Sequence, residues 1–285
     1  MKTVLVIGAT GMIGRIVSSQ LLEDGYRVVA MVRNPSKAGN ELKKGIELIR
    51  GDVTSYNDVL QACRNADFIH ISTSGGNNQE NIMAVEYEGT LNVLQAAIEM
   101  RIKHITMISG MHVNKDSLDH PAEKAKYLAE NAIKSSSIPY TIFKPTFFME
   151  TLERHIQGNK AVIIGKQPKA LNMIAAKDLA KNISKTYQMN EAINQVFFPK
   201  GKEAIKLKNA LEQYVSKKSP GMKVHVVPIW LMQIADKLFI KRKLSRVIGI
   251  MKLLQKEGEA GSSDHYFNVY GDHTTSFEQW LKLNT

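Results

Sequence analysis

A glycine-rich turn near the N-terminus constrains this chain more than any other stretch. Apolar residues 4–7 predict a buried strand, and glycines follow at positions 8, 11 and 14. Apolar residues then recur at helical spacing over 16–22, so the stretch predicts a strand, a tight turn and a helix. Such a turn offers the unpaired N–H groups of a helix N-terminus to a dinucleotide pyrophosphate. The alternative is an ordinary strand-to-helix turn of an α/β protein.

The second predicted strand begins where a dinucleotide-binding unit requires it. Asp24 and Gly25 predict a turn, and the strand runs over 27–32. It ends at Arg33, where an NAD-specific site normally places an acid on the adenosine ribose. An arginine there suits the 2′-phosphate of NADP(H), and Lys37 is close enough in the chain to assist. The alternative is an exposed arginine in a polar loop.

The composition is that of a large globular α/β protein. The 285 residues are 44% hydrophobic and 23% charged, which allows a sizeable core. The single cysteine, Cys63, excludes an internal disulfide framework, suits a reducing compartment and is expected to pack on a helix face. The first residues lack a secretory pattern, and no apolar run approaches the roughly 18 residues of a membrane span, so we expect a cytoplasmic protein.

Strands and helices continue to alternate along the chain. Further strands are expected over 46–50, from 66 and over 103–110, and a long helix over 77–100. Small side chains follow the fourth strand and leave room for a cofactor ribose: Ser72, Thr73 and Ser74. This order predicts a doubly wound, mainly parallel sheet that binds its ligand at the carboxyl ends of the strands.

The glycine turn, Gly8-Ala9-Thr10-Gly11-Met12-Ile13-Gly14, resembles that of extended and atypical short-chain dehydrogenases/reductases. Residues 137–150 and 173–180 resemble stretches of the NmrA-like and isoflavone-reductase-like members, and the resemblance covers about residues 1–215. It implies a Rossmann core over 1–150. Residues 151–285 would then form a small C-terminal α+β lobe, for substrate or as a lid, interleaved with the last strands of the sheet.

The resemblance also implies two groups of site residues. The expected cofactor-binding residues are Gly8, Thr10, Gly11, Met12, Ile13, Gly14, Arg33, Lys37, Asp52, Val53, Ser72, Thr73, Ser74, Lys126, Pro145 and Phe147. The expected substrate pocket comprises Met111, His112, Phe148 and Met149. Two alternatives stay open: Asp52 could instead cap the helix that begins near Tyr56, and Phe147, Phe148 and Met149 could be plain core residues.

The catalytic motif that the resemblance implies is incomplete. In this superfamily a helical Tyr-x-x-x-Lys pair transfers the proton and holds the nicotinamide ribose. Lys126 takes the place of the lysine, but Ala122 stands where the tyrosine is usual, and Tyr127 points about 100° away from Lys126. Ser109 takes the place of the catalytic serine. The alternatives are a solvent-facing helix lysine and a turn serine.

The C-terminal part carries all of the chain's excess positive charge. Residues 200–256 hold fourteen Lys or Arg and three acids, a net of +11, which equals the net charge of the whole chain. Two apolar helical segments, 229–240 and 244–254, flank Lys241-Arg242-Lys243. These segments could cover the substrate as a lid, touch anionic lipid or nucleic acid, or present a solvated face. The sequence contains no nucleic-acid-binding motif and no metal-ligand spacing.

These features predict an NAD(P)H-binding oxidoreductase that prefers NADP(H) over NAD(H) and reduces a small carbonyl, a quinone or a similar acceptor. The missing tyrosine keeps a second hypothesis open, a non-catalytic NADP(H) sensor that signals to a protein partner through the basic lobe. Nucleotide-sugar epimerisation is a weaker third alternative, because that chemistry uses the Tyr/Lys pair directly. The sequence leaves the substrate and the oligomeric state open.

Overall fold

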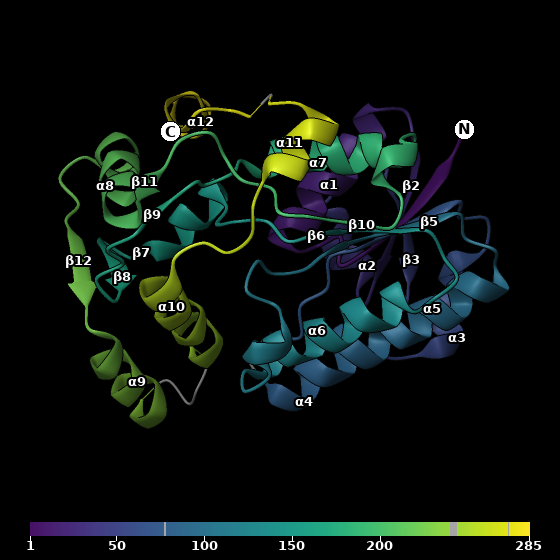
Figure 1. Ribbon diagram of the computed structural model, residues 1–285, viewed down its shortest axis with the longest axis horizontal. Coiled ribbons are helices and arrows are strands. Elements are labelled where there is room, and N and C mark those ends of the chain that lie inside the picture. Colours follow the sequence, from purple (N-terminus) through teal and green to yellow (C-terminus); the bar gives the residue numbers. More distant parts are fainter. Residues whose placement is uncertain (77, 240–243, 273) are drawn as a thin grey trace.

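A seven-stranded parallel sheet forms the centre of the computed structural model, which describes residues 1–76, 78–239, 244–272 and 274–285 (Figure 1). The strand order is β10-β6-β5-β4-β1-β2-β3, and every neighbouring pair is parallel. The strands are β1 (Thr3–Ile7), β2 (Arg27–Val32), β3 (Glu47–Arg50), β4 (Phe68–Ile71), β5 (His104–Ile108), β6 (Tyr140–Phe143) and β10 (Gln195–Phe197). The order reverses between β1 and β4, so the predicted doubly wound Rossmann fold is confirmed.

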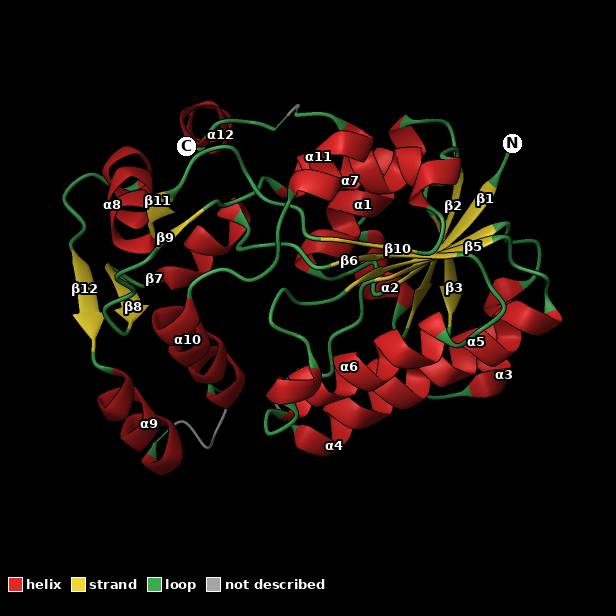
Figure 2. Cartoon of the chain, viewed as in Figure 1, coloured by secondary structure: helices red, strands yellow, loops and turns green. Residues whose placement is uncertain are grey.

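Helices cover both faces of this sheet (Figure 2), which explains why its strands are nearly continuous apolar runs. One face packs against α1 (Met12–Glu23), α7 (Ala176–Thr186) and α11 (Asp264–Tyr270), with the short α2 (Pro35–Gly39) beside them. The other face packs against α3 (Tyr56–Cys63), α5 (Gly89–Glu99) and α6 (Pro121–Lys134). Cys63 is buried on the inner face of α3, as the sequence predicted.

The helical stretch expected over 77–100 consists of three parts. These are α4 (Gln79–Ile82), a π-helix η1 (Met83–Glu88) and α5. The expected first residue, Asn77, lies outside the described residues. The π-helix is wider than an α-helix, and such turns frequently occur at functional sites. It places the carboxylate of Glu86 fully inside the protein.

The C-terminal part of the chain builds a second, smaller core. Its three-stranded sheet has the order β12-β8-β7, and β11 pairs with β9. Its elements are η3 (Met149–His155), β7 (Ile156–Gln157), β8 (Lys160–Ile164), β9 (Ala170–Leu171), β11 (Ile205–Lys206), α8 (Leu207–Lys218), β12 (Val224–Val227), α9 (Ile229–Leu238), α10 (Ser245–Glu257) and α12 (Phe277–Asn284). Two short 3-10 turns, η2 (Lys115–Ser117) and η4 (Asn190–Ala192), complete the list.

The two cores are interleaved along the sequence. Although α7, β10 and α11 follow residue 150, they pack with the large sheet. In α12, Trp280 is buried and its indole N–H donates to Glu150 at 3.1 Å. The two predicted apolar segments are α9 and α10, and Lys241-Arg242-Lys243 between them lies outside the described residues.

Candidate functional site

The turn between β1 and α1 has the geometry of a phosphate-binding loop. Gly8 has a φ of +91°, and a Cβ atom there would lie 2.4 Å from the Ser72 carbonyl oxygen. A Cβ atom at Gly14 would lie 2.1 Å from the Gly8 carbonyl oxygen. Gly11 is the N-cap of α1 and offers no side chain to its first N–H groups. These groups are therefore left to an anion such as a pyrophosphate, which fits the predicted cofactor.

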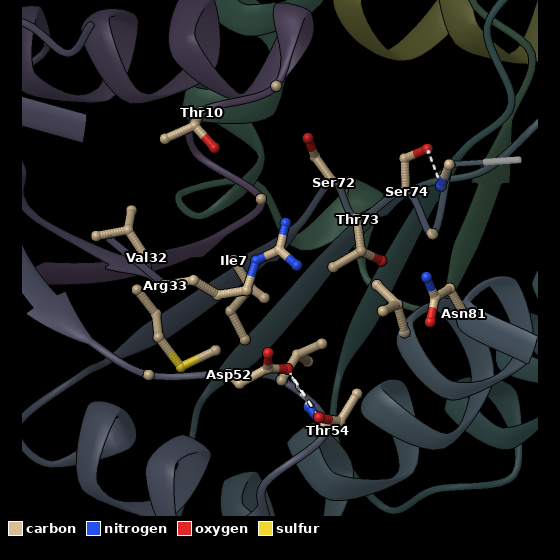
Figure 3. A pocket seen from close by; sticks show the side chains of 18 of the residues that line it. Ile7, Thr10, Val32, Arg33, Asp52, Thr54, Ser72, Thr73, Ser74 and Asn81 are labelled. Carbon is tan, nitrogen blue, oxygen red and sulfur yellow. Dashed lines mark hydrogen bonds between the residues drawn. The ribbon is translucent and has the colours of Figure 1, made fainter. Parts of the chain in front are cut away.

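A cavity of about 540 Å³ opens at this turn, beside the point where the strand order reverses (Figure 3). It is lined by the ends of four neighbouring strands, by α4 and by η1: Ile7, Gly8, Thr10, Gly11, Met31, Val32, Arg33, Gly51, Asp52, Val53, Thr54, Ser72, Thr73, Ser74, Gly75, Gly76, Asn81, Ala84 and Val85. Ligands of open α/β sheets bind in this position. Nine of the predicted cofactor residues line the cavity: Gly8, Thr10, Gly11, Arg33, Asp52, Val53, Ser72, Thr73 and Ser74.

Arg33 and Asp52 lie at the part of the cavity formed by β2 and β3. The guanidinium of Arg33 projects into the cavity (Figure 3). The Asp52 carboxylate accepts bonds from the N–H and the hydroxyl of Thr54, at 3.0 and 2.8 Å. The cap of α3 is Ser55 instead, so the alternative role of Asp52 as that cap is wrong. Lys37 lies on α2, exposed and outside the cavity lining.

Glu86 is the centre of a buried ion cluster next to this cavity. Its carboxylate lies 3.2 Å from the Lys126 ammonium and 2.6 Å from the Arg246 guanidinium, and it accepts from the Gly75 N–H at 2.9 Å. Burial acts to raise the pKa of Glu86, but Lys126, Arg246 and the Gly75 N–H lower it below its usual value. Glu86 therefore stays ionised at neutral pH.

Arg246 connects the C-terminal lobe to the wall of the cavity. It lies on α10, yet it donates to the Ser74 hydroxyl at 3.1 Å and to the Gly76 carbonyl at 3.3 Å, in addition to Glu86. The loop that carries Ser74 and Gly76 follows β4 and lines the cavity. The guanidinium of Arg246 thus connects α10, the π-helix and the loop after β4.

Lys126 lies at the carboxyl edge of the sheet, at the end of β5. Its ammonium is 3.4 Å from the Ile108 carbonyl oxygen and 3.2 Å from Glu86. Its side chain is 13% exposed, so the alternative of a solvent-facing lysine is wrong. One helical turn earlier, Ala122 is buried against Ile82 and Ala125 in a small apolar cluster. A methyl group therefore occupies the place where the superfamily has its phenol.

Ser109 is held away from the cavity by a buried network. Its hydroxyl donates to Glu130 at 2.5 Å, and Glu130 also pairs with Lys144 at 3.1 Å. Lys144 donates in addition to the Val113 carbonyl. Burial lowers the pKa of Lys144 even though Glu130 acts to raise it. Ser109 cannot donate its hydroxyl proton to a ligand while it donates to Glu130.

The other predicted site residues lie outside the cavity lining. Met12, Ile13 and Gly14 begin α1, and Pro145 follows β6; these four do not line the cavity. Phe147 and Met111 pack against the C-terminal core, Met149 is inside it, and Phe148 packs against the sheet core. His112 lies 2.8 Å through Nε2 from the Gly258 carbonyl oxygen, in the segment after α10. Met149 is therefore a core residue, which was the alternative to its role in a substrate pocket. Met111 and His112 contact the C-terminal lobe.

Sequence reasoning missed three contributors to this region: Glu86, Arg246 and Asn81. Glu86 did carry a signal, because an acid on the inner side of an apolar helical stretch needs a buried cation. Arg246 lies 160 residues further along the chain, and no spacing rule connects the two. Among the described residues, no cluster of His, Cys, Asp and Glu could hold a metal ion, and no helix is long and apolar enough to cross a membrane.

Comparison with known proteins places this geometry in context. A family model described as NAD(P)H-binding matches residues 8–189. The photosystem II assembly factor Ycf39 of Trieres chinensis is 28% identical over 83% of this chain and 76% of its own length. The chloroplastic divinyl chlorophyllide a 8-vinyl-reductase of Arabidopsis thaliana is also 28% identical, over 68% of this chain and 52% of its own length. The triphenylmethane reductase of Citrobacter sp., solved with NADP(H), shares the fold with a TM-score of 0.76, at 19% identity over 99% of this chain and all of that one.

Proposed function

Because this chain belongs to the NAD(P)H-binding family, among the NmrA-like and isoflavone-reductase-like atypical short-chain dehydrogenases/reductases, we propose that it is an NADPH-dependent reductase of a small carbonyl, a quinone or a similar conjugated acceptor. The observation that carries this proposal is the cavity at the carboxyl edge of the sheet, with the glycine turn at one end and Arg33 projecting into it. A nicotinamide cofactor would supply the hydride when bound.

In this proposal each wall of the cavity has its own part in holding the cofactor. The N-terminus of α1 binds the pyrophosphate, and Arg33 pairs with the 2′-phosphate, with Lys37 as a second cation on the neighbouring α2. Asp52 and Val53 lie against the adenine. Ser72, Thr73 and Ser74 border the riboses. The preference for NADP(H) rests on Arg33, because an arginine would not accept hydrogen bonds from the free ribose hydroxyls of NAD(H).

Lys126 is the residue proposed to act at the reacting end. Its ammonium lies at the end of β5, where it would hold the nicotinamide ribose or donate the proton that accompanies the hydride. The carboxylate of Glu86, 3.2 Å away, holds this ammonium in place. Met111 and His112 would border the acceptor between the two cores, with residues 1–150 holding the cofactor and the lobe after residue 150 enclosing the substrate. Two of the similar proteins are named as reductases, which supports the proposed reductase activity.

The experiment is NADPH consumption by the purified protein against a panel of quinones and aldehydes, with cofactor binding measured by calorimetry in the same samples. Arg33→Ala should weaken NADPH binding by about tenfold or more, the loss of one charge-assisted contact, and NADH binding far less. Equal losses for the two cofactors would refute the 2′-phosphate assignment. Lys126→Ala should abolish turnover, whereas its matched control Lys124→Ala, an exposed lysine on the same helix, should keep it.

A second candidate function is a non-catalytic NADP(H) sensor. The burial of Ala122 where the phenol is usual favours it, because a sensor needs no proton donor. The name of one relative, an assembly factor, also supports a protein partner. Cofactor binding without consumption across the whole panel would favour the sensor. The same alanine argues against epimerisation, since that chemistry needs the Tyr/Lys pair.

A further inference from the structure

One face of α9 exposes large apolar side chains to solvent. Trp230 is 62% exposed, Leu231 43%, Ile234 47% and Leu238 65%. At 100° per residue these four positions fall within an arc of about 100° on the helix. Phe239, directly after α9, is 80% exposed. We call these five residues the α9 face. Single exposed apolar side chains are common on protein surfaces, but a group of five on and directly after one helix is not.

The opposite side of α9 fixes the helix to the protein. Ile229 and Met232 pack against the C-terminal core, and the buried carboxylate of Asp236 accepts from the Leu244 N–H at 2.8 Å. The α9 face is therefore the side that this lobe does not use for its own packing. The helix lies at the outer end of the lobe, away from the large sheet (Figure 1).

The segment that carries this apolar face is strongly basic. Residues 200–256, which include α9, carry the net +11 of the chain. Lys237 is exposed and lies about 20° outside the apolar arc, and Lys252 and Lys256 are exposed on the neighbouring α10. The sequence adds Lys241, Arg242 and Lys243 directly after the face. A second copy is a poor occupant, because it would bring two lobes of +11 together.

We propose that the α9 face binds the surface of an anionic lipid membrane. Tryptophan and long aliphatic side chains on one helix face enter the boundary between headgroups and acyl chains, and they need no complementary pocket to do so. Lys237 beside the face and the other cations of residues 200–256 attract acidic headgroups. The helix lies in the membrane plane with its apolar arc inserted.

The test is binding of the full-length protein to vesicles of phosphatidylcholine, with and without 30% phosphatidylglycerol, measured by co-sedimentation and by tryptophan emission. Trp280 is 5% exposed, so a blue shift on vesicle addition reports on Trp230. We expect binding to the anionic vesicles, at least tenfold weaker in 0.5 M NaCl. The variant Trp230→Ser/Leu238→Ser should bind at least tenfold more weakly. Ile98→Ser, which removes a 55% exposed side chain from α5, should bind like the wild type.

Several results would overturn the proposal. Equal binding to neutral and anionic vesicles would show that charge does not contribute to binding. Binding of Trp230→Ser/Leu238→Ser as strong as that of the wild type would show that the α9 face does not contact the membrane. Sedimentation equilibrium that shows a dimer, lost in the same variant, would assign the face to a second copy. Circular dichroism of each variant checks its fold; exposed positions are chosen so that the fold is preserved. Turnover is not a readout here, so the result is independent of the proposed reductase activity.

Discussion

Replacing Arg246 by methionine tests whether the buried ion cluster joins the two cores. Methionine keeps the aliphatic stem and removes the guanidinium that lies 2.6 Å from Glu86. Removing one partner of a buried ion pair costs about 3 to 5 kcal/mol, mostly because the other charge stays buried. Lys126 at 3.2 Å and the Gly75 N–H still compensate Glu86, so the lower value of about 3 kcal/mol applies. For a chain of this size that corresponds to a fall in Tm of roughly 6 °C.

The double variant Glu86→Gln/Arg246→Met identifies the source of that loss. Glu86→Gln alone should cost about 2 kcal/mol, because Lys126 and Arg246 are partly exposed and regain water. The double variant should cost only about 3 kcal/mol, which leaves a coupling free energy of about 2 kcal/mol. The assay is urea unfolding followed by circular dichroism at pH 7. The control is Lys256→Met, which breaks an exposed pair with Glu257 on the same helix and should cost less than about 0.5 kcal/mol.

A loss for Arg246→Met no larger than that for Lys256→Met would refute the reasoning, and so would a coupling near zero. A change in cofactor affinity is a second readout of the same variant. Arg246 holds Ser74 and Gly76 in the wall of the cavity, so Arg246→Met should weaken NADPH binding several-fold. Lys256→Met should leave that affinity unchanged.

Three further predictions follow from single positions. Gly14→Ala should prevent stable folding or cofactor binding, because its Cβ atom would lie 2.1 Å from the Gly8 carbonyl oxygen; Gly249→Ala, with no atom nearer than 3.8 Å, should be neutral or stabilising by up to about 1 kcal/mol in urea unfolding. Burial raises the pKa of Cys63 to about 12, so Ellman's reagent at pH 8 should modify it only at the rate of unfolding, and fast modification of the native protein would contradict its burial. Burial acts to raise the pKa of Asp67, but bonds from Lys103, the Thr3 N–H and Lys2 lower it to about 2, so this group stabilises the fold above its unfolded pKa near 4 and loses that effect as pH falls toward 2. Asp67→Asn should flatten the pH dependence of the urea midpoint over that range; an unchanged slope would argue against these contacts.

Local patterns were enough to predict the large sheet and its ligand-binding edge. Most of its strands are buried apolar runs separated by turns and amphipathic helices. The glycines at 8 and 14 make close backbone contacts and Gly11 caps α1, and their spacing in the sequence indicates this turn. The residues at the ends of those strands, such as Arg33 and Asp52, line the cavity for the same reason. Parallel strands bring their carboxyl ends to one edge, whatever the loops contain.

Features that depend on contacts between distant parts of the chain were not predicted. The apolar spacing over 77–100 fits an ordinary helix, and it does not show that residues 83–88 widen into a π-helix. Glu86 meets Arg246 only because α10 folds back onto that turn. The resemblance placed Ser109 near the chemistry, but its hydroxyl is committed to Glu130 by the neighbouring α6. Such pairings are decided by tertiary packing, which periodicity does not encode.

The position of α11 has a consequence for how the protein is made. Tyr266 and Tyr270 of this helix are buried in the same core as Val17 and Leu21 of α1, and Phe197 of β10 lies 5.2 Å from Tyr270, centroid to centroid. A nascent chain that has reached residue 150 therefore lacks part of the core of its first half. At 5 to 20 residues per second, translation to α11 takes about 6 to 24 s more. During that interval the N-terminal half exposes apolar surface, which chaperones would have to shield until the last tenth of the chain emerges.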